Sequence, residues 1–106
     1  MNIKDERTTE LIKNIAAEFL QRESNPESLI TVTDATFSER AKSATVFFTV
    51  FPEDKEESAL SFAKRKRTEF REYFKEKTRT RIIPFFDFEI DKGEKNRQKI
   101  DRLLEN

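Results

Sequence analysis

One stretch of the chain, Lys64–Arg81, concentrates the side chains that could bind a charged ligand. It reads KRKRTEFREYFKEKTRTR and holds nine basic and three acidic residues, a net charge of +6. The whole chain has 21 basic and 21 acidic residues, so the remainder carries a net charge of −6. A segregated positive block is typical of a surface that binds a polyanion. The alternative is charge at helix ends that complements two helix dipoles and keeps the surface hydrated.

Helix dipoles do not explain the whole block. Four consecutive cations open it, and Arg79 and Arg81 continue it to the end of the helix expected there and beyond. If that helix is only mildly kinked, Lys64, Arg67, Arg71 and Lys75 form one stripe along which a phosphate backbone could lie. The candidate phosphate-binding residues are Lys64, Arg65, Lys66, Arg67, Arg71, Lys75, Arg79 and Arg81.

The residue types that are missing exclude several function classes. The chain has no Cys and no His, which removes thiolate chemistry, Cys-type zinc sites and the usual general base near neutral pH. Gly93 is the single glycine, so no Gly-rich phosphate loop can form. We therefore expect no enzyme, no cofactor and no metal site. No apolar run reaches membrane-spanning length and no signal-peptide pattern opens the chain, which predicts a soluble cytoplasmic protein.

Two further groups of side chains could have a function. Asp87, Glu89 and Asp91 alternate and could bind Mg²⁺ or transfer protons, but a solvated, charged face of an edge strand is the favoured interpretation. Phe47 and Phe51 could be a platform on which bases stack. For them we favour packing, in the core or as aromatic cover for a helix or the C-terminal tail, because aromatic residues in strands usually pack.

The elements that position these residues follow from the hydrophobic pattern. The 106 residues predict one domain, and eleven Phe compensate for a composition only 35% hydrophobic and 40% charged. Helices are expected over 3–23 (capped by Asn2 or Asp5), 53–67, 69–79 and 94–105. Strands are expected over 29–37, with a bulge near Thr33 and Asp34, over 44–51 and over 82–91.

A break is expected between the second and third helices, at Lys66–Thr68. In one straight helix the ammonium of Lys66 would lie on the buried side, between Phe62 and Phe70, and an unpaired buried charge is costly. Thr68 is the expected N-cap of the third helix. The order α-β-β-α-α-β plus a tail helix predicts an α+β domain with two layers, a three-stranded sheet and helices on one face.

This order is similar to that of a type II KH domain, and several runs make the chain resemble the ribosome-binding factor A family over nearly its whole length. The runs are Gln21-Arg22-Glu23, Asn25-Pro26, Thr31-Val32-Thr33-Asp34, Ser38, Ala44-Thr45-Val46-Phe47-Phe48-Thr49-Val50, Arg79-Thr80-Arg81-Ile82-Ile83-Pro84, Phe86, Phe88 and Asp91. The chain departs from the family pattern at Asn25, where Asp is usual. It also has Lys66-Arg67-Thr68 at the kink, where the family has Ala-x-Gly.

The resemblance implies a non-catalytic, monomeric, cytoplasmic assembly factor that binds 16S rRNA of the small (30S) ribosomal subunit during its maturation and rRNA processing. It also implies that residues 1–106 are a single RNA-binding domain. Without a glycine at the kink, the side chains of Lys64–Arg67 would have to make the contacts. The alternative is a protein-interaction module whose acidic stretches, Glu53–Glu57 and Asp87–Asp91, bind a basic protein. A hydrolase that uses carboxylates alone is the third and weakest possibility.

Overall fold

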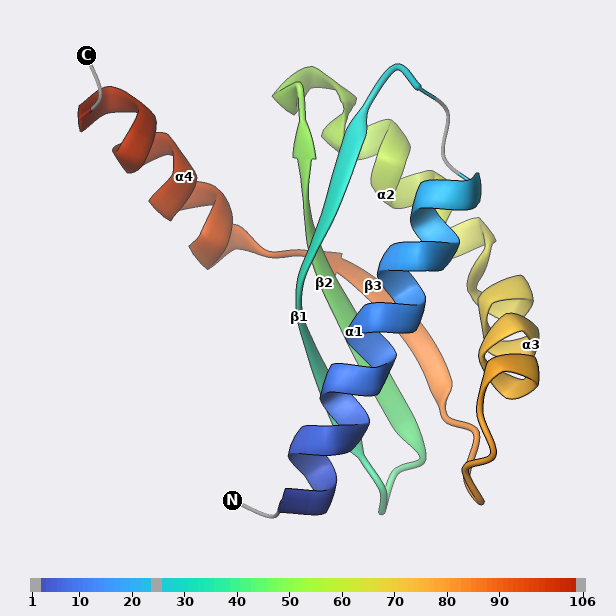
Figure 1. Cartoon of the computed structure of the whole chain (residues 1–106). Coiled ribbons are helices and arrows are strands. Elements are labelled where there is room, and N and C mark those ends of the chain that lie inside the picture. Colours follow the sequence, from blue (N-terminus) through green and yellow to red (C-terminus); the bar gives the residue numbers. More distant parts are fainter. Residues whose placement is uncertain (1–2, 24–25, 105–106) are drawn as a thin grey trace.

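The first helix covers one face of the sheet. In the computed structural model, which describes residues 3–23 and 26–104, α1 spans Ile3–Glu23 (Figure 1). Its apolar residues recur every three or four positions and so share one side of the helix. Ile12, Ala16 and Phe19 are almost fully buried. The expected bounds of this helix are confirmed. The two expected capping groups, Asn2 and the side chain of Asp5, lie outside the part of the chain that the structure describes.

The sheet has three strands in the order β1-β2-β3. The strands β1 (Leu29–Ser38) and β2 (Ser43–Phe51) form an antiparallel hairpin, and β3 (Phe85–Ile90) runs parallel to β2. The register of the hairpin shifts between Val32 and Asp34, which confirms the expected bulge. The third strand begins at Phe85 and not at residue 82, because Pro84 has no N–H with which to join the ladder.

The two central helices are separated by one residue. A 3-10 turn, Glu53–Lys55, leads into α2 (Glu56–Arg65), and α3 spans Arg67–Lys77. Lys66 alone forms the break, so the expected kink is confirmed. The expected cap is wrong, because α3 begins before Thr68 and no side chain caps it. At its other end α3 stops at Lys77, so Arg79 lies two residues beyond the helix.

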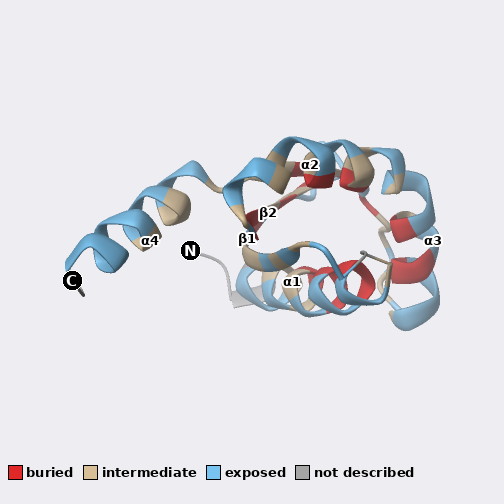
Figure 2. Ribbon diagram, turned by 90° about the horizontal axis from the view of Figure 1, so that it is seen from above, coloured by how far each residue is buried: buried red, intermediate tan, exposed pale blue. Residues whose placement is uncertain are grey.

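The core lies between the sheet and helices α1, α2 and α3, as Figure 2 shows from above. Phe70 of α3 is at its centre and is fully buried. The centroid of its ring is 5.2 Å from that of Phe19, 4.6 Å from that of Phe86 and 5.5 Å from that of Phe88. One aromatic side chain thus joins α1, α3 and β3, which confirms the two-layer α+β architecture.

The other face of the sheet is largely free of helices. The last helix, α4 (Lys92–Leu104), projects from the end of β3 away from the layers (Figure 1). Phe47 is half-buried on this face, and Phe51 is 59% exposed beside α4. Phe51 is therefore not a core residue, and of the expected positions it takes the one beside the tail helix, where it stays largely exposed. None of the helices described here has the length and apolar character needed to cross a membrane.

Candidate nucleic-acid interface

The end of α2 is attached to the edge strand β3 by an ion-pair cluster. The Nζ atom of Lys64 is 3.0 Å from an oxygen of Asp87 and 3.4 Å from an oxygen of Glu89. The hydrogen bond to Asp87 is the main reason why the pKa of Lys64 is raised. Burial favours a higher pKa for Asp87, but its hydrogen bonds from Lys64 and the Phe88 N–H, with the nearby charges, lower that pKa overall.

Arg67, the first residue of α3, joins the same cluster. Its Nη1 atom is 3.3 Å from Asp87, and its Nε donates to the carbonyl of Lys64 at 2.9 Å. The two helices on either side of the break are therefore tied to one carboxylate of the sheet. This arrangement neutralises part of the positive block.

The break itself does not require glycine. Lys66 has φ −94° and ψ 7°, a bridge conformation with negative φ that residues other than glycine adopt. Its Nζ atom is 3.2 Å from Glu69 and lies 5.8 Å from the centre of the Phe62 ring. The backbone thus explains why a lysine can occupy this position, and the ammonium is paired and not buried alone.

Arg71 supports the segment that enters β3. Its Nε donates to the carbonyl of Pro84 at 3.1 Å and its Nη2 to that of Ile83 at 3.0 Å. Its guanidinium also lies 4.4 Å from the centre of the Phe85 ring. The N–H groups expected to contact phosphates are in this structure directed to the protein backbone.

The other predicted contacts are exposed. The side chains of Arg65, Lys75, Arg79 and Arg81 make no hydrogen bond or ion pair with any residue in the described part of the chain. Arg65 is at the end of α2, Lys75 in the last turn of α3, and Arg79 and Arg81 in the connection to β3. Within the described stretch Lys64–Arg81, these are the cations whose side chains no other residue already pairs.

The predicted stripe is therefore divided. Figures 1 and 2 show α3 turning away from the line of α2, so the kink is not mild. Lys64 and Arg67 lie at the ion-pair cluster, Arg71 faces the backbone of 83–84, and Lys75 is exposed. The sequence contained no signal for these pairings, since Lys64 and Asp87 are 23 residues apart along the chain.

A second network that the sequence did not reveal holds α3 to α1. The Tyr73 hydroxyl donates to Glu18 at 2.5 Å, and the Nζ atom of Lys77 is 3.4 Å from the same carboxylate. The hydrogen bond from Tyr73 is the leading cause of a lowered pKa for Glu18. Lys77 is exposed but paired with Glu18, which distinguishes it from the four unpaired cations.

The alternating carboxylates do not converge. Asp87 and Glu89 bind Lys64, whereas an oxygen of Asp91 accepts from the hydroxyl of Thr33 at 2.6 Å. Across residues 3–23 and 26–104 no group of three or more possible ligands could hold a metal ion. This arrangement fits the favoured interpretation, in which these residues form the charged face of an edge strand. Lys64 of α2 and Arg67 of α3 are the partners of that face.

The order of elements, the mixed sheet and the kinked helix pair define a small domain of the type II KH-like class. A model of the ribosome-binding factor A family matches residues 4–104. The chain belongs to the ribosome-binding factor A family. This is a family of ribosome biogenesis factors that are not enzymes, as the sequence led us to expect.

Individual relatives agree with this membership. The chain is 34% identical over 96 residues to ribosome-binding factor A of Thermobifida fusca (strain YX), a match that covers 88% of the chain and 64% of that protein. The chain thus spans slightly less than two thirds of its relative.

Two solved structures have the same fold. The crystal structure of ribosome-binding factor A from Thermus thermophilus superposes with a TM-score of 0.72 at 24% identity, over 81% of this chain and 94% of that one. A solution structure of a Thermotoga maritima protein proposed to be a ribosome-binding factor A gives a TM-score of 0.69 at 24% identity, over 88% and 93%.

Proposed function

We propose that this chain is a non-catalytic, monomeric assembly factor of the cytoplasm. It binds 16S rRNA of the maturing small (30S) ribosomal subunit and supports maturation and rRNA processing. Residues 1–106 act as one KH-like RNA-binding domain. Family membership supports the ribosomal target, and the exposed, unpaired cations support contact with RNA. By binding one rRNA conformation more tightly than others, the protein shifts the rRNA toward that conformation.

The single observation that carries this proposal is the division of the basic block. Four cations, Arg65, Lys75, Arg79 and Arg81, face solvent without a described protein partner. Lys64 and Arg67 are instead held in ion pairs that are themselves partly exposed. A phosphate backbone could contact the first group directly, whereas it would have to displace carboxylates to contact the second group. The initial contact therefore belongs to the exposed group.

The test is co-sedimentation with small-subunit precursors over a range of salt concentrations. Replacing Arg65, Lys75, Arg79 and Arg81 together by Gln should weaken binding and reduce the slope of log K against log salt by about 3, at roughly 0.7 per lost phosphate contact. The control replaces Lys92, Arg97, Lys99 and Arg102 of α4 by Gln, with the same change of charge. If the first variant binds like the wild type, the site is misassigned. If the wild-type protein does not sediment with small subunits, the function is wrong.

The acidic alternative has less support from the structure. Glu53 lies 3.1 Å from both Lys95 and Lys99, and Glu56 lies 3.0 Å from Lys95. Asp87 and Glu89 are also paired, as described above. Much of the acidic surface is therefore already neutralised by cations of the same chain. Association that survives RNase treatment and loss of the four cations would favour a basic protein partner.

A further inference from the structure

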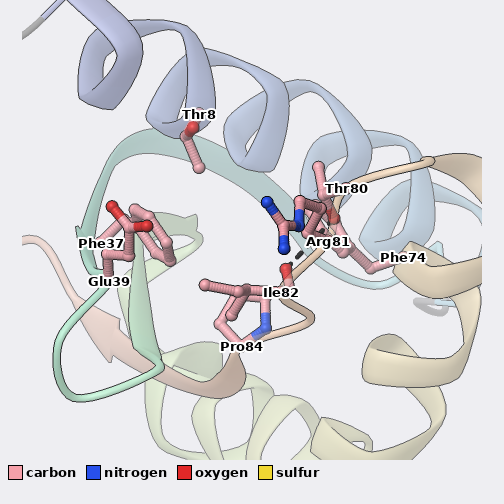
Figure 3. A pocket seen from close by; sticks show the side chains of 8 residues that line it. All are labelled: Thr8, Phe37, Glu39, Phe74, Thr80, Arg81, Ile82 and Pro84. Carbon is pink, nitrogen blue, oxygen red and sulfur yellow. Dashed lines mark hydrogen bonds between the residues drawn. The ribbon is translucent and has the colours of Figure 1, made fainter.

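A cavity lies at the end of the sheet away from α4, between α1, the β1–β2 hairpin and segment 78–84 (Figure 3). Its volume is about 520 Å³. Sites for small organic ligands commonly measure about 300–1,000 Å³, so the cavity can admit a flat heterocycle together with part of a sugar. It adjoins the exposed cations of segment 78–84, because Arg81 is one of its lining residues.

The walls of the cavity are mainly apolar and rigid. Phe74 and Pro84 are buried, and Phe37 and Ile82 are half-buried. Phe74 is held in the core by Phe86, whose ring centre is 5.1 Å from its own. Phe74 and Pro84 therefore support the wall, and the partly exposed Phe37 and Ile82 are the side chains on which the face of a nucleobase can lie. Stacking of this kind depends little on which base is bound. The walls therefore suit a planar, apolar group.

The rim carries one charge of each sign. Figure 3 shows Arg81 reaching from segment 78–84 into the opening, while Glu39 lies on the hairpin beside Phe37. Both side chains are exposed, and neither makes a hydrogen bond or ion pair with another side chain in the described ranges. A ligand that satisfies both needs an anionic part for Arg81 and N–H donors for Glu39. A nucleotide has both, since its flat base carries N–H donors and is joined through the sugar to an anionic phosphate.

We propose that this cavity binds an unpaired nucleobase of the RNA and that it prefers guanine. Guanine alone among the four bases presents two adjacent donors, N1–H and the 2-amino group, to a carboxylate. The other bases place a carbonyl or ring-nitrogen acceptor beside their donor, which Glu39 would repel. The phosphate of the same nucleotide lies at Arg81, with Arg79 two residues away. This inference rests on the proposed function, since it names a base of the RNA bound there.

The test compares short single-stranded RNAs that differ at one position. Fluorescence anisotropy with full-length protein measures binding of a uridine hexamer that contains one guanine, one inosine or one adenine. Inosine lacks only the 2-amino group. We expect the guanine RNA to bind about tenfold more tightly than the adenine RNA, with inosine between them, as befits a bidentate pair. Glu39→Gln should remove most of this preference. Glu57→Gln, an equal loss of charge at an exposed position of α2, should keep it.

The outcomes separate this proposal from the function on which it rests. Equal affinities for the three RNAs, from a protein that still sediments with small subunits, would overturn the base site alone. A preference that Glu39→Gln leaves intact would also overturn it. If free guanosine monophosphate competes as strongly as the guanine RNA, the cavity takes a free nucleotide and the assignment to RNA is wrong. Absence of binding to small subunits would refute the proposed function itself.

Discussion

The Nζ atom of Lys64 lies 3.0 Å from a carboxylate oxygen of Asp87, so the first cation of the basic block is held by the last strand of the sheet. Arg67 reaches the same carboxylate from the next helix. The carboxylate therefore competes with any phosphate for both cations. The affinity of this basic surface for phosphate groups therefore depends on the neighbouring acidic residues as well as on its own cations.

Replacing Asp87 by Asn should strengthen binding to RNA. The change would remove the carboxylate partner of Arg67 and leave Lys64 only its longer ion pair with Glu89. One or two more phosphate contacts should make the slope of log K against log salt steeper by about 0.7 each. Salt-dependent binding to small-subunit precursors measures this. Glu57→Gln, which removes the same charge from an exposed site, should change the slope much less. Unchanged or weaker binding by the Asp87 variant would contradict the competition.

Arg71 should act on stability and not mainly on RNA binding. Lysine keeps the charge but cannot donate to both the Ile83 and Pro84 carbonyls in the same planar geometry or stack equally on Phe85. Arg71→Lys should lower the free energy of unfolding by about 1–3 kcal/mol, measured by urea denaturation. Arg65→Lys, at an exposed cation, should stay within about 0.5 kcal/mol of wild type. Equal stability of the two variants would show that the carbonyl contacts contribute little.

Phe70 should be among the most sensitive positions in the core. Its ring is fully buried and contacts aromatic rings from α1, α3 and β3, so truncation leaves a cavity that those rings can fill only in part. Phe70→Ala should cost about 3–5 kcal/mol in the free energy of unfolding. Phe85→Ala is the comparison, because Phe85 is 66% exposed and loses mainly its contact with Arg71, worth about 1 kcal/mol. A similar loss at both positions would argue against a core centred on Phe70.

Local patterns in the sequence were sufficient for the fold. The period of the apolar residues predicted α1, and the change of parity along β1 predicted the bulge beside Thr33. The cost of burying Lys66 predicted the break between α2 and α3. Each of these follows from residues close together in the chain. The cap at Thr68 failed because α3 begins at Arg67, so that Thr68 already lies inside the helix.

The division of the basic block could not be predicted in the same way. Charge counts assign equal value to every Lys and Arg, but Asp87 lies 20 residues from Arg67 and meets it only when β3 joins the sheet. The role of Arg71 has the same origin, since its partners are backbone carbonyls that carry no sequence signal. Long-range pairing therefore determines which cations remain unpaired, and the distinction between the paired Arg71 and the unpaired Arg81 required the structure.

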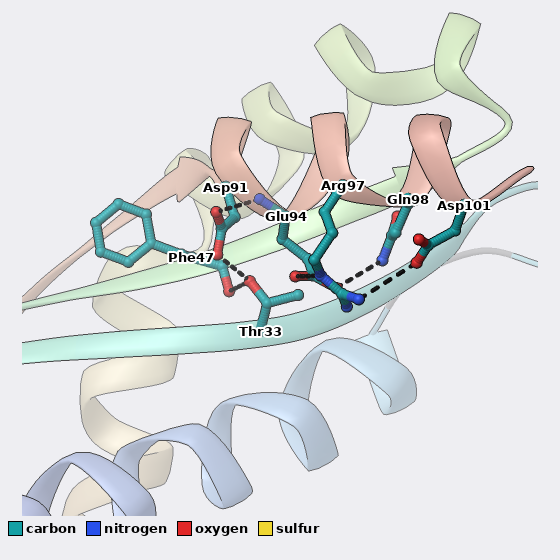
Figure 4. Close-up of polar contacts among 7 residues, drawn as sticks. All are labelled: Thr33, Phe47, Asp91, Glu94, Arg97, Gln98 and Asp101. Carbon is teal, nitrogen blue, oxygen red and sulfur yellow. Dashed lines mark hydrogen bonds and ion pairs between the residues drawn. The ribbon is translucent and has the colours of Figure 1, made fainter. Parts of the chain in front are cut away.

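Asp91 should make stability depend on pH. Its carboxylate accepts from the backbone N–H of Glu94 at 3.0 Å, at the start of α4, and from Thr33 at 2.6 Å (Figure 4). These hydrogen bonds, that of Glu94 first, lower the pKa of Asp91. A carboxyl with a lowered folded-state pKa stabilises the protein above its unfolded pKa of about 3.9, and this contribution is lost as the pH falls through the folded value.

Asp91→Ala should therefore lower the free energy of unfolding by about 1 kcal/mol near pH 7, as for other helix caps, with a smaller difference below about pH 4. Urea denaturation across this pH range measures the effect, and Glu76→Ala, at an exposed position, should show much less pH dependence. A difference that stays constant with pH would mean that ionisation of Asp91 does not contribute.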